Sequence, residues 1–295
     1  MSQSSFIDGE VQARVAGLSI YPVKSCAGVA LNEAPLGPTG LALDRAWMVV
    51  DAQGAFLTQR EWPRMVLVRP QVGAQRLTLN APDMPPLQVP LEPTEKKALR
   101  VRIWKDTVDA WDAGDAAAQW FSAFLQKPGL RLARFNPAVR RLSNLEWTRG
   151  VEAVNQFADG YPLLVLSQAA VTELNQRLRS ADSAQPPVTA ARLRPNLVLS
   201  DIEAHDEDRL SEMRIVTQEG GGVRLKLVKP CTRCPIPGID PDTAAHDPRV
   251  WAALAAYRAD PRVNGALTFG MNAIILEGAG QILRVGDHVS ADWNF

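Results

Sequence analysis

The chain has 295 residues and a mass of 32.2 kDa, which suggests one large domain or two of ordinary size. Hydrophobic residues make up 46% of the sequence, enough for a packed core, so general disorder is excluded. Lys and Arg number 32, as do Asp and Glu. A neutral chain has no long-range field that would draw it to nucleic acid or to an anionic membrane, so neither is expected as a partner.

The N-terminal sequence has no basic start followed by an apolar core, as a secretory signal would. No stretch approaches the ~20 apolar residues of a membrane span. We therefore expect a cytoplasmic protein.

The first half of the chain is predicted to consist mainly of strands. Alternating or β-branched residues predict strands over 15–21, 45–51 and 65–72, with a turn at 52–54 and a return strand from residue 56. Proline-rich residues 80–95 predict surface loops, and short strands are expected at 101–104 and 107–110. A helix is predicted over 112–125, because Ala116, Trp120, Phe121 and Phe124 share one face. Residues 126–160 are polar and irregular, and we expect the domain boundary there.

The second half mixes strands and helices. Strands are predicted at 162–166, 197–199, 273–276 and 288–290, and helices at 168–179 and 248–257, the first capped by Ser167. A hairpin is expected from 213–217 and 223–228 around three glycines. The order of elements is α+β rather than a βαβ series, and neither a dinucleotide nor a phosphate-loop glycine motif occurs.

The sharpest chemical feature is the segment Lys229-Pro230-Cys231-Thr232-Arg233-Cys234-Pro235. Cationic neighbours lower a thiol pKa and favour the thiolate, which is a soft metal ligand. The third cysteine is Cys26. An odd count argues against a disulfide framework, and three thiolates cannot hold an all-cysteine iron–sulfur cluster. Pro235 and Pro237 oppose the helix that follows a thioredoxin-type CxxC. Zinc or two incidental loop cysteines remain alternatives.

Several cations follow strand ends. Lys24 and Ser25 suit a phosphate or carboxylate, and arginines such as Arg45, Arg60 and Arg194 offer paired donors to phosphate. Each alone is typical of a surface charge, but together they would form an anion pocket. No hydrolase triad or zinc-protease motif is present.

These segments together resemble the MOSC family (molybdenum cofactor sulfurase C-terminal domain), in particular the mitochondrial amidoxime-reducing components and their bacterial relatives. The resemblance rests on LSIYPVKSCAGV, LDRAWMVVD, TQREWPRMVLV, AAAQWFSAFL, FADGYPLLVLSQAAVTELN, RLRPNLVLSD, VKPCTRCPIPGIDPDT and VGDHV, from about residue 14 to about 290. It implies a MOSC N-terminal β domain over 10–126 and a MOSC β-barrel domain over 145–293. Pro235, Pro237 and Ala244 depart from the family pattern, which places glycine where Ala244 stands.

The resemblance also implies a molybdenum–pyranopterin cofactor with Cys234 as the metal ligand and catalytic thiolate. The residues implied to bind the cofactor are Lys24, Ser25, Arg45, Ser167, Arg194, Asn196, Thr232 and Arg233. Asp240 is a candidate proton source. The implied activity is reduction of N-hydroxylated substrates such as amidoximes, hydroxylamines and N-hydroxylated bases. Electrons would come from a separate ferredoxin-, flavodoxin- or cytochrome b5-like donor with a reductase.

Two other functions stay open. The same thiolate would serve a molybdenum cofactor carrier or a sulfur-transfer protein acting with a partner, because the chain has no pyridoxal-phosphate domain of its own and pyridoxal phosphate binding is not expected. A zinc or structural protein is the third alternative, and it rests on the CxxC spacing alone.

Overall fold

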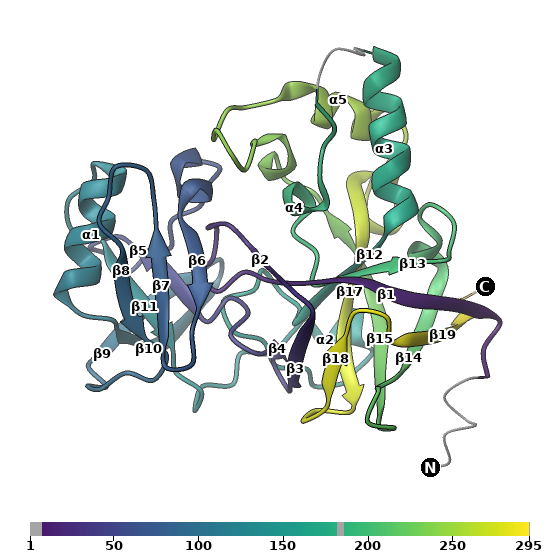
Figure 1. The fold of residues 1–295 in the computed structure, drawn as a ribbon, viewed down its shortest axis with the longest axis horizontal. Coiled ribbons are helices and arrows are strands. Elements are labelled where there is room, and N and C mark those ends of the chain that lie inside the picture. The colour runs from purple at the N-terminus through teal and green to yellow at the C-terminus, as the bar shows by residue number, and fades with distance from the viewer. Residues whose placement is uncertain (1–7, 182–185, 295) are drawn as a thin grey trace.

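Residues 8–181 and 186–294 are described by the computed structural model, in which a closed barrel lies beside a second, strand-rich part (Figure 1). The barrel strands, in the order of their pairing, are β12 (Leu163–Ser167), β13 (Leu197–Ser200), β1 (Val11–Ile20), β19 (His288–Trp293), β14 (Leu210–Val216), β15 (Gly222–Thr232) and β17 (Ala266–Glu277). Pairing of β12 with both β13 and β17 closes the barrel. The fold is the strand-rich α+β class that the sequence predicts.

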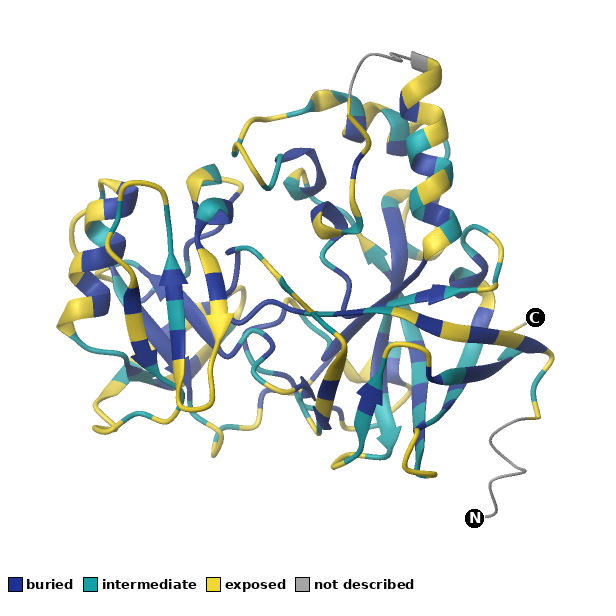
Figure 2. Cartoon of the chain, in the orientation of Figure 1, coloured by how far each residue is buried: buried dark blue, intermediate teal, exposed yellow. Residues whose placement is uncertain are grey.

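Alternation along the strands explains the barrel core. In β1, Val11, Ala13 and Val15 are buried while the residues between them are exposed, as expected for a strand with one face toward the interior (Figure 2). Two short strands pair antiparallel with barrel strands: β2 (Val29–Leu31) with β1, and β16 (Ala259–Asp260) with β17.

The second part, hereafter the N-terminal part, contains two sheets. One has the order β5 (Trp47–Val50), β11 (Arg131–Phe135), β10 (Asp106–Asp112) and β9 (Ala98–Ile103); the other has β6 (Arg69–Val72), β7 (Arg76–Asn80) and β8 (Leu87–Pro90). Helix α1 (Asp115–Leu125) buries Trp120, Phe121 and Phe124 in the same core as residues of these sheets, which confirms three of the four residues predicted for its apolar face. The fourth, Ala116, is exposed.

The remaining elements cover the barrel or join the two parts. They are the small sheet β18 (Ile282–Arg284), β3 (Glu33–Gly37) and β4 (Gly40–Leu41), the helices α2 (Leu145–Thr148), α3 (Gln168–Ala181), α4 (Ala190–Leu193) and α5 (Pro248–Ala255), and the 3₁₀ helices η2 (Pro63–Leu67), η3 (Asp206–Arg209), η4 (Ile236–Gly238) and η5 (Pro261–Val263). Leu174 of α3 and Leu254 of α5 share one buried cluster with Leu166 of β12. No helix within the described ranges has the length and apolarity to cross a membrane.

Four predictions of local structure differ from what is observed. The return strand expected from residue 56 is absent from the described elements, where Ala55 and Phe56 form only isolated bridges. Residues 65–72 begin in η2, which starts at Pro63, and only β6 is a strand. The 80–95 segment contains β8, where Pro90 is tolerated because β8 is an edge strand. The irregular 126–160 segment contains β11, whose residues Leu132–Phe135 are all buried between β5 and β10.

The chain also crosses between the two parts. Strand β1 lies in the barrel although it precedes the N-terminal part in sequence, and β11 joins the N-terminal sheet although it follows residue 126. The division into 10–126 and 145–293 stays a prediction.

Candidate functional site

A cavity of about 1270 Å³ lies between the barrel and the N-terminal part, with lining residues from both. Its lining contains nine lysine and arginine residues but only two acidic residues, Asp106 and Asp159. The chain as a whole is neutral, so the fold concentrates positive charge at this one place.

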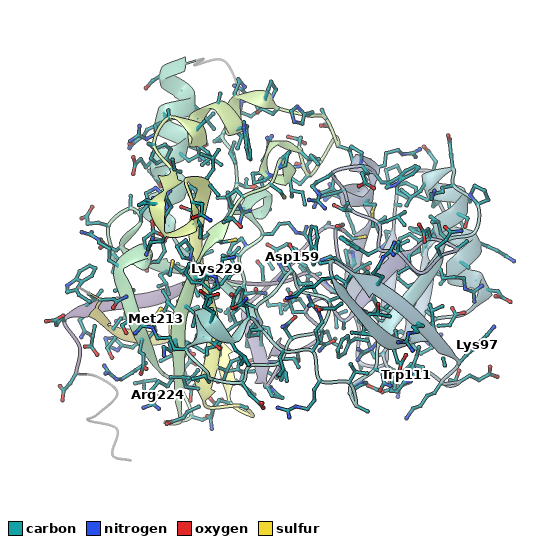
Figure 3. All side chains as sticks on the ribbon, turned by 180° about the vertical axis from the view of Figure 1, so that it is seen from behind. Lys97, Trp111, Asp159, Met213, Arg224 and Lys229 are labelled. Carbon is teal, nitrogen blue, oxygen red and sulfur yellow. The ribbon has the colours of Figure 1, made fainter. Side chains whose placement is uncertain are left out.

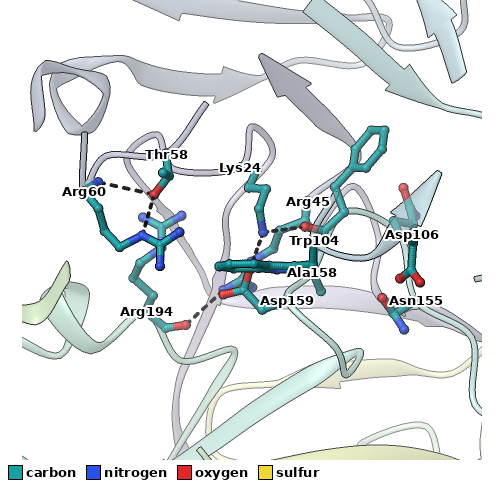
Figure 4. A network of polar contacts seen from close by, with 12 residues as sticks. Lys24, Arg45, Thr58, Arg60, Trp104, Asp106, Asn155, Ala158, Asp159 and Arg194 are labelled. Carbon is teal, nitrogen blue, oxygen red and sulfur yellow. Dashed lines mark hydrogen bonds and ion pairs between the residues drawn. The ribbon is translucent and has the colours of Figure 1, made fainter. Parts of the chain in front are cut away.

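Lys24 and Ser25 line the cavity from the turn that follows β1, and Figure 4 shows Lys24 there. The Lys24 side chain is buried, and its Nζ donates to the Phe157 carbonyl (2.9 Å) and forms an ion pair with Asp159. Burial lowers the pKa of Lys24, and the Asp159 carboxylate opposes that shift. Ser25 has a positive φ of 67°, so the turn holds a strained conformation in order to present this pair.

Arg45 and Arg194 converge from distant positions in the sequence. Both guanidinium groups lie over the Tyr21 ring, with Cζ at 4.3 and 4.2 Å from its centroid. Arg45 donates to Asp44 Oδ1 (2.8 Å) and to Asn196 Oδ1 (3.1 Å). Burial and the neighbouring charge of Arg45 lower the pKa of Arg194 to about 10. Two cations held this close favour an anionic ligand between or beside them.

The cysteine loop forms the barrel side of the cavity. Strand β15 pairs irregularly with β17, with register shifts between Leu227 and Lys229 and between Pro230 and Thr232. Such bulges re-aim side chains. Cys231 and Cys234 both line the cavity, and Arg233 Nη1 lies 3.2 Å from the Cys231 sulfur. Only the short η4 follows, as the two prolines predict. Cys26 is buried, and burial raises its pKa to about 12.

Most of the predicted site residues share this cavity. They are Lys24, Ser25, Arg45, Arg194, Asn196, Thr232, Arg233 and Cys234. Arg60, considered only as one of several arginines, lines it as well.

Two predicted residues lie outside the lining. Ser167 Oγ accepts hydrogen bonds from the N–H groups of Ala170 and His205 (both 3.2 Å), so this buried hydroxyl caps α3. Its contact with the cofactor stays a prediction. The sequence predicted that cap correctly.

Asp240, the candidate proton source, is also absent from the lining. Its Oδ1 accepts from the N–H groups of Asp242 and Thr243 (both 2.9 Å), and its Oδ2 accepts from Arg192 (2.7 Å). Desolvation raises the Asp240 pKa, but the two backbone hydrogen bonds and further contacts outweigh it and the net shift is downward. A carboxylate that stays ionised and accepts hydrogen bonds within a turn is a poor proton donor. The position of Asp240 therefore does not support proton delivery.

Sequence reasoning missed several lining residues. Asp159 and Tyr161 belong to the FADGYP segment, which contributed only to the family resemblance. Trp104 and Trp147 sit in segments with no motif at all. A carboxylate and aromatic side chains have many structural uses, so no local pattern distinguishes those that face a cavity.

The donor set fits an anionic cofactor that brings its own metal ligands. No group of three or more His, Cys, Asp or Glu side chains within the described ranges could hold a metal ion. Cys234 can therefore supply one soft ligand while the cofactor supplies the others. Arg233 Nε is a buried donor that finds no acceptor among the described residues, at the wall of the same cavity. An unmatched donor beside paired arginines suits a phosphate or pterin oxygen.

Fold and site together define a two-part, strand-rich α+β protein with a basic, thiol-containing cavity between its parts. The MOSC N-terminal beta barrel domain matches residues 12–128, and the MOSC domain matches residues 152–290. The mitochondrial amidoxime-reducing component 1 of Mus musculus is 36% identical over 287 residues, covering 93% of this chain and 81% of the relative; that of Homo sapiens is 34% identical, covering 93% and 82%. The chain belongs to the MOSC family.

A molybdenum cofactor sulfurase of Danio rerio is also similar, at 30% identity over 311 residues. That match covers 98% of this chain but only 35% of the sulfurase. The likeness thus concerns one portion of a much longer protein.

Proposed function

We propose that this protein is a molybdenum cofactor-dependent oxidoreductase that reduces N-hydroxylated compounds with electrons from a separate partner. The observation that carries the proposal is one cavity holding the Cys234 thiol among buried and half-buried cations. The names of the relatives that match most of the chain, amidoxime-reducing components, support the substrate class. Bound in this cavity, the cofactor would supply two-electron chemistry in which the substrate N–O bond breaks and the oxygen leaves as water.

Each group of residues has a part in this proposal. Arg45 and Arg194 bind the phosphate, Lys24 and Ser25 add a charge and a hydroxyl, and Cys234 ligates the metal. The loop residues Thr232 and Arg233 hold the pterin side beside Asn196, which fixes Arg45 through its amide oxygen (3.1 Å). The protein thereby positions the cofactor and tunes it electrostatically.

A carrier or sulfur-transfer role is the second candidate. It is favoured by the likeness to a molybdenum cofactor sulfurase and by the position of Cys231 in the cavity, with Arg233 Nη1 3.2 Å from its sulfur. A protein of this kind would carry persulfide sulfur on a cysteine and would not turn over amidoximes.

The test compares wild type with Cys234→Ser and Cys231→Ser, each purified from a host that makes the cofactor in excess. We expect near-stoichiometric molybdenum and pterin in wild type and in Cys231→Ser, with benzamidoxime reduced to benzamidine by a chemical reductant. Cys234→Ser should lose molybdenum ligation and activity. Persulfide on either cysteine, found by mass spectrometry without any amidoxime reduction, would replace this proposal with the sulfur-transfer role. Zinc without pterin would exclude both.

A further inference from the structure

Two tryptophans line the cavity from opposite parts of the molecule, each with a cation over its ring. Arg60 Cζ lies 4.9 Å from the centroid of Trp104 in the N-terminal part. Lys229 Nζ lies 5.4 Å from the centroid of Trp147 on the barrel side, where Figure 3 labels Lys229. Neither pair is needed for the cofactor contacts described above.

Most other cations of the cavity are already matched by carboxylates. Ion pairs join Lys24 to Asp159, Arg45 to Asp44, Arg140 to Glu152 and Arg141 to Asp106. By contrast, Arg60 and Lys229 have no carboxylate within ion-pairing distance among the described residues. Among the described residues, the Arg60 guanidinium donates only to Thr58 Oγ1 (3.3 Å), a contact visible in Figure 4, and Arg60 lines the cavity. These two cations are therefore available to an anion.

Apolar side chains line part of the wall beside them, and Trp104 is held by two contacts. Trp104 Nε1 donates to Asp159 Oδ1 (3.1 Å), and the indole meets Phe56 edge-on at 5.0 Å between centroids. Trp104 is nevertheless 44% exposed, and the exposed residues Leu142 and Leu145 line the same cavity. A fixed aromatic surface that stays accessible suits a flat apolar ligand.

Taking the proposed reductase function as its basis, we propose that Arg60 and Lys229, with Trp104 and Trp147, select N-hydroxylated substrates that combine a flat body with a carboxylate or phosphate. The ring would lie against a tryptophan, and the anionic group would meet the cation beside it. The selectivity acts on binding, because these side chains contact the part of the substrate remote from the N–O bond. It should therefore appear mainly in KM.

The experiment uses the cofactor-loaded enzyme, a chemical reductant and matched substrate pairs. Benzamidoxime is compared with 4-carboxybenzamidoxime, and N4-hydroxycytidine with its 5′-monophosphate, so that carboxylate and phosphate are distinguished. For at least one pair we expect the anionic member to be preferred by roughly tenfold in kcat/KM, a preference that shrinks as salt is raised. Arg60→Gln or Lys229→Gln should reduce that preference at least fivefold while changing KM for the neutral member less than twofold.

Arg76→Gln is the matched control, because Arg76 is exposed on β7 and does not line the cavity. It should leave the preference unchanged. Calorimetric titration of 4-carboxybenzamidine against benzamidine measures the same selectivity without turnover. If the loaded protein reduces no substrate, the proposed function fails, while this titration still decides the selectivity.

Three results would overturn the selectivity. The first is equal use of the neutral and anionic members, and the second is an unchanged preference in both cation variants. The third comes from the same assays repeated with a protein electron donor in place of the chemical reductant, if Arg60→Gln impairs only those. The last result would assign these cations to docking of an acidic protein partner instead.

Discussion

Lys24 and Asp159 form an ion pair whose two members have opposite environments: the lysine side chain is 7% exposed and the aspartate side chain 72% exposed. Desolvation raises the Asp159 pKa, but the Lys24 ammonium and the Trp104 indole N–H outweigh it and hold that pKa below its usual range. The carboxylate is therefore ionised at neutral pH, and it compensates the one lysine of the cavity that is buried.

Asp159→Asn should leave the buried ammonium with amide and carbonyl oxygens only. We expect a loss of about 1–2 kcal/mol in the free energy of unfolding at pH 7, less than for a fully buried pair because water screens the exposed carboxylate. Urea denaturation measures it. As a control, Asp242→Asn removes the exposed partner of Arg69 and should cost under about 0.5 kcal/mol. Equal effects of the two variants would mean that Asp159 contributes no more than a surface charge.

Glu207 gives stability a dependence on pH. It is fully buried in η3, and burial, reinforced by the charge of Asp208, raises its pKa from 4.5 to about 7. Between these values the unfolded chain loses the proton that the folded protein keeps, so stability falls as pH rises from about 4.5 to 7. Glu207→Gln should remove this decline, which is worth roughly 3 kcal/mol at pH 8.

The measurement is the difference in unfolding free energy between Glu207→Gln and wild type at pH 5 and at pH 8. Neutral His205, whose pKa burial lowers to about 4, adds an opposite slope between pH 6.5 and 4 in both proteins and cancels in the difference. A difference that is the same at pH 5 and at pH 8 would show that folding does not raise the Glu207 pKa.

Ala244 occupies a left-handed backbone conformation, with φ of 61°. The resemblance implies glycine at this position, which adopts such a φ without a Cβ penalty, whereas alanine bears the strain. Ala244→Gly should stabilise the protein by about 0.5–1 kcal/mol, since relief of strain exceeds the entropy that glycine adds to the unfolded chain. Ala245→Gly is the control in the next position, which lacks positive φ, and it should destabilise. Thermal unfolding of both variants checks the sign; destabilisation by Ala244→Gly would contradict the prediction.

The variant Asp240→Asn tests whether Asp240 stabilises its turn through hydrogen bonds or delivers a proton to the substrate. Because the carboxylate lies outside the cavity and binds Arg192 and two backbone N–H groups, we expect kcat for benzamidoxime within about threefold of wild type, with a small loss of stability. Loss of a general acid would lower kcat by 10²-fold or more. Steady-state kinetics on the loaded enzyme separates the two outcomes.

Local patterns succeeded where one face of an element is buried. The alternation in β1, the apolar face of α1 and the cap of α3 at Ser167 all follow from neighbouring residues. Strand β11 was missed because Arg131 and Arg134 interrupt its apolar residues. Arg131 pairs with Asp112 of β10, a partner that lies 19 residues away. A strand that is stabilised by such cross-strand pairs has little β-strand pattern in its own sequence.

The sequence by itself determined the fold class, the family resemblance and a thiol-bearing loop after a strand, because these depend on residue type and spacing along the chain. Only the tertiary structure decided that Arg45 meets Asn196 across 151 residues. It also decided that Ser167 and Asp240 lie outside the cavity lining and that Asp159 and two tryptophans belong to it. Ser25, Arg45 and Arg194 all have positive φ, which surrounding contacts must enforce. Long-range packing brings these residues together in one cavity, and the secondary-structure propensities of neighbouring residues cannot predict it.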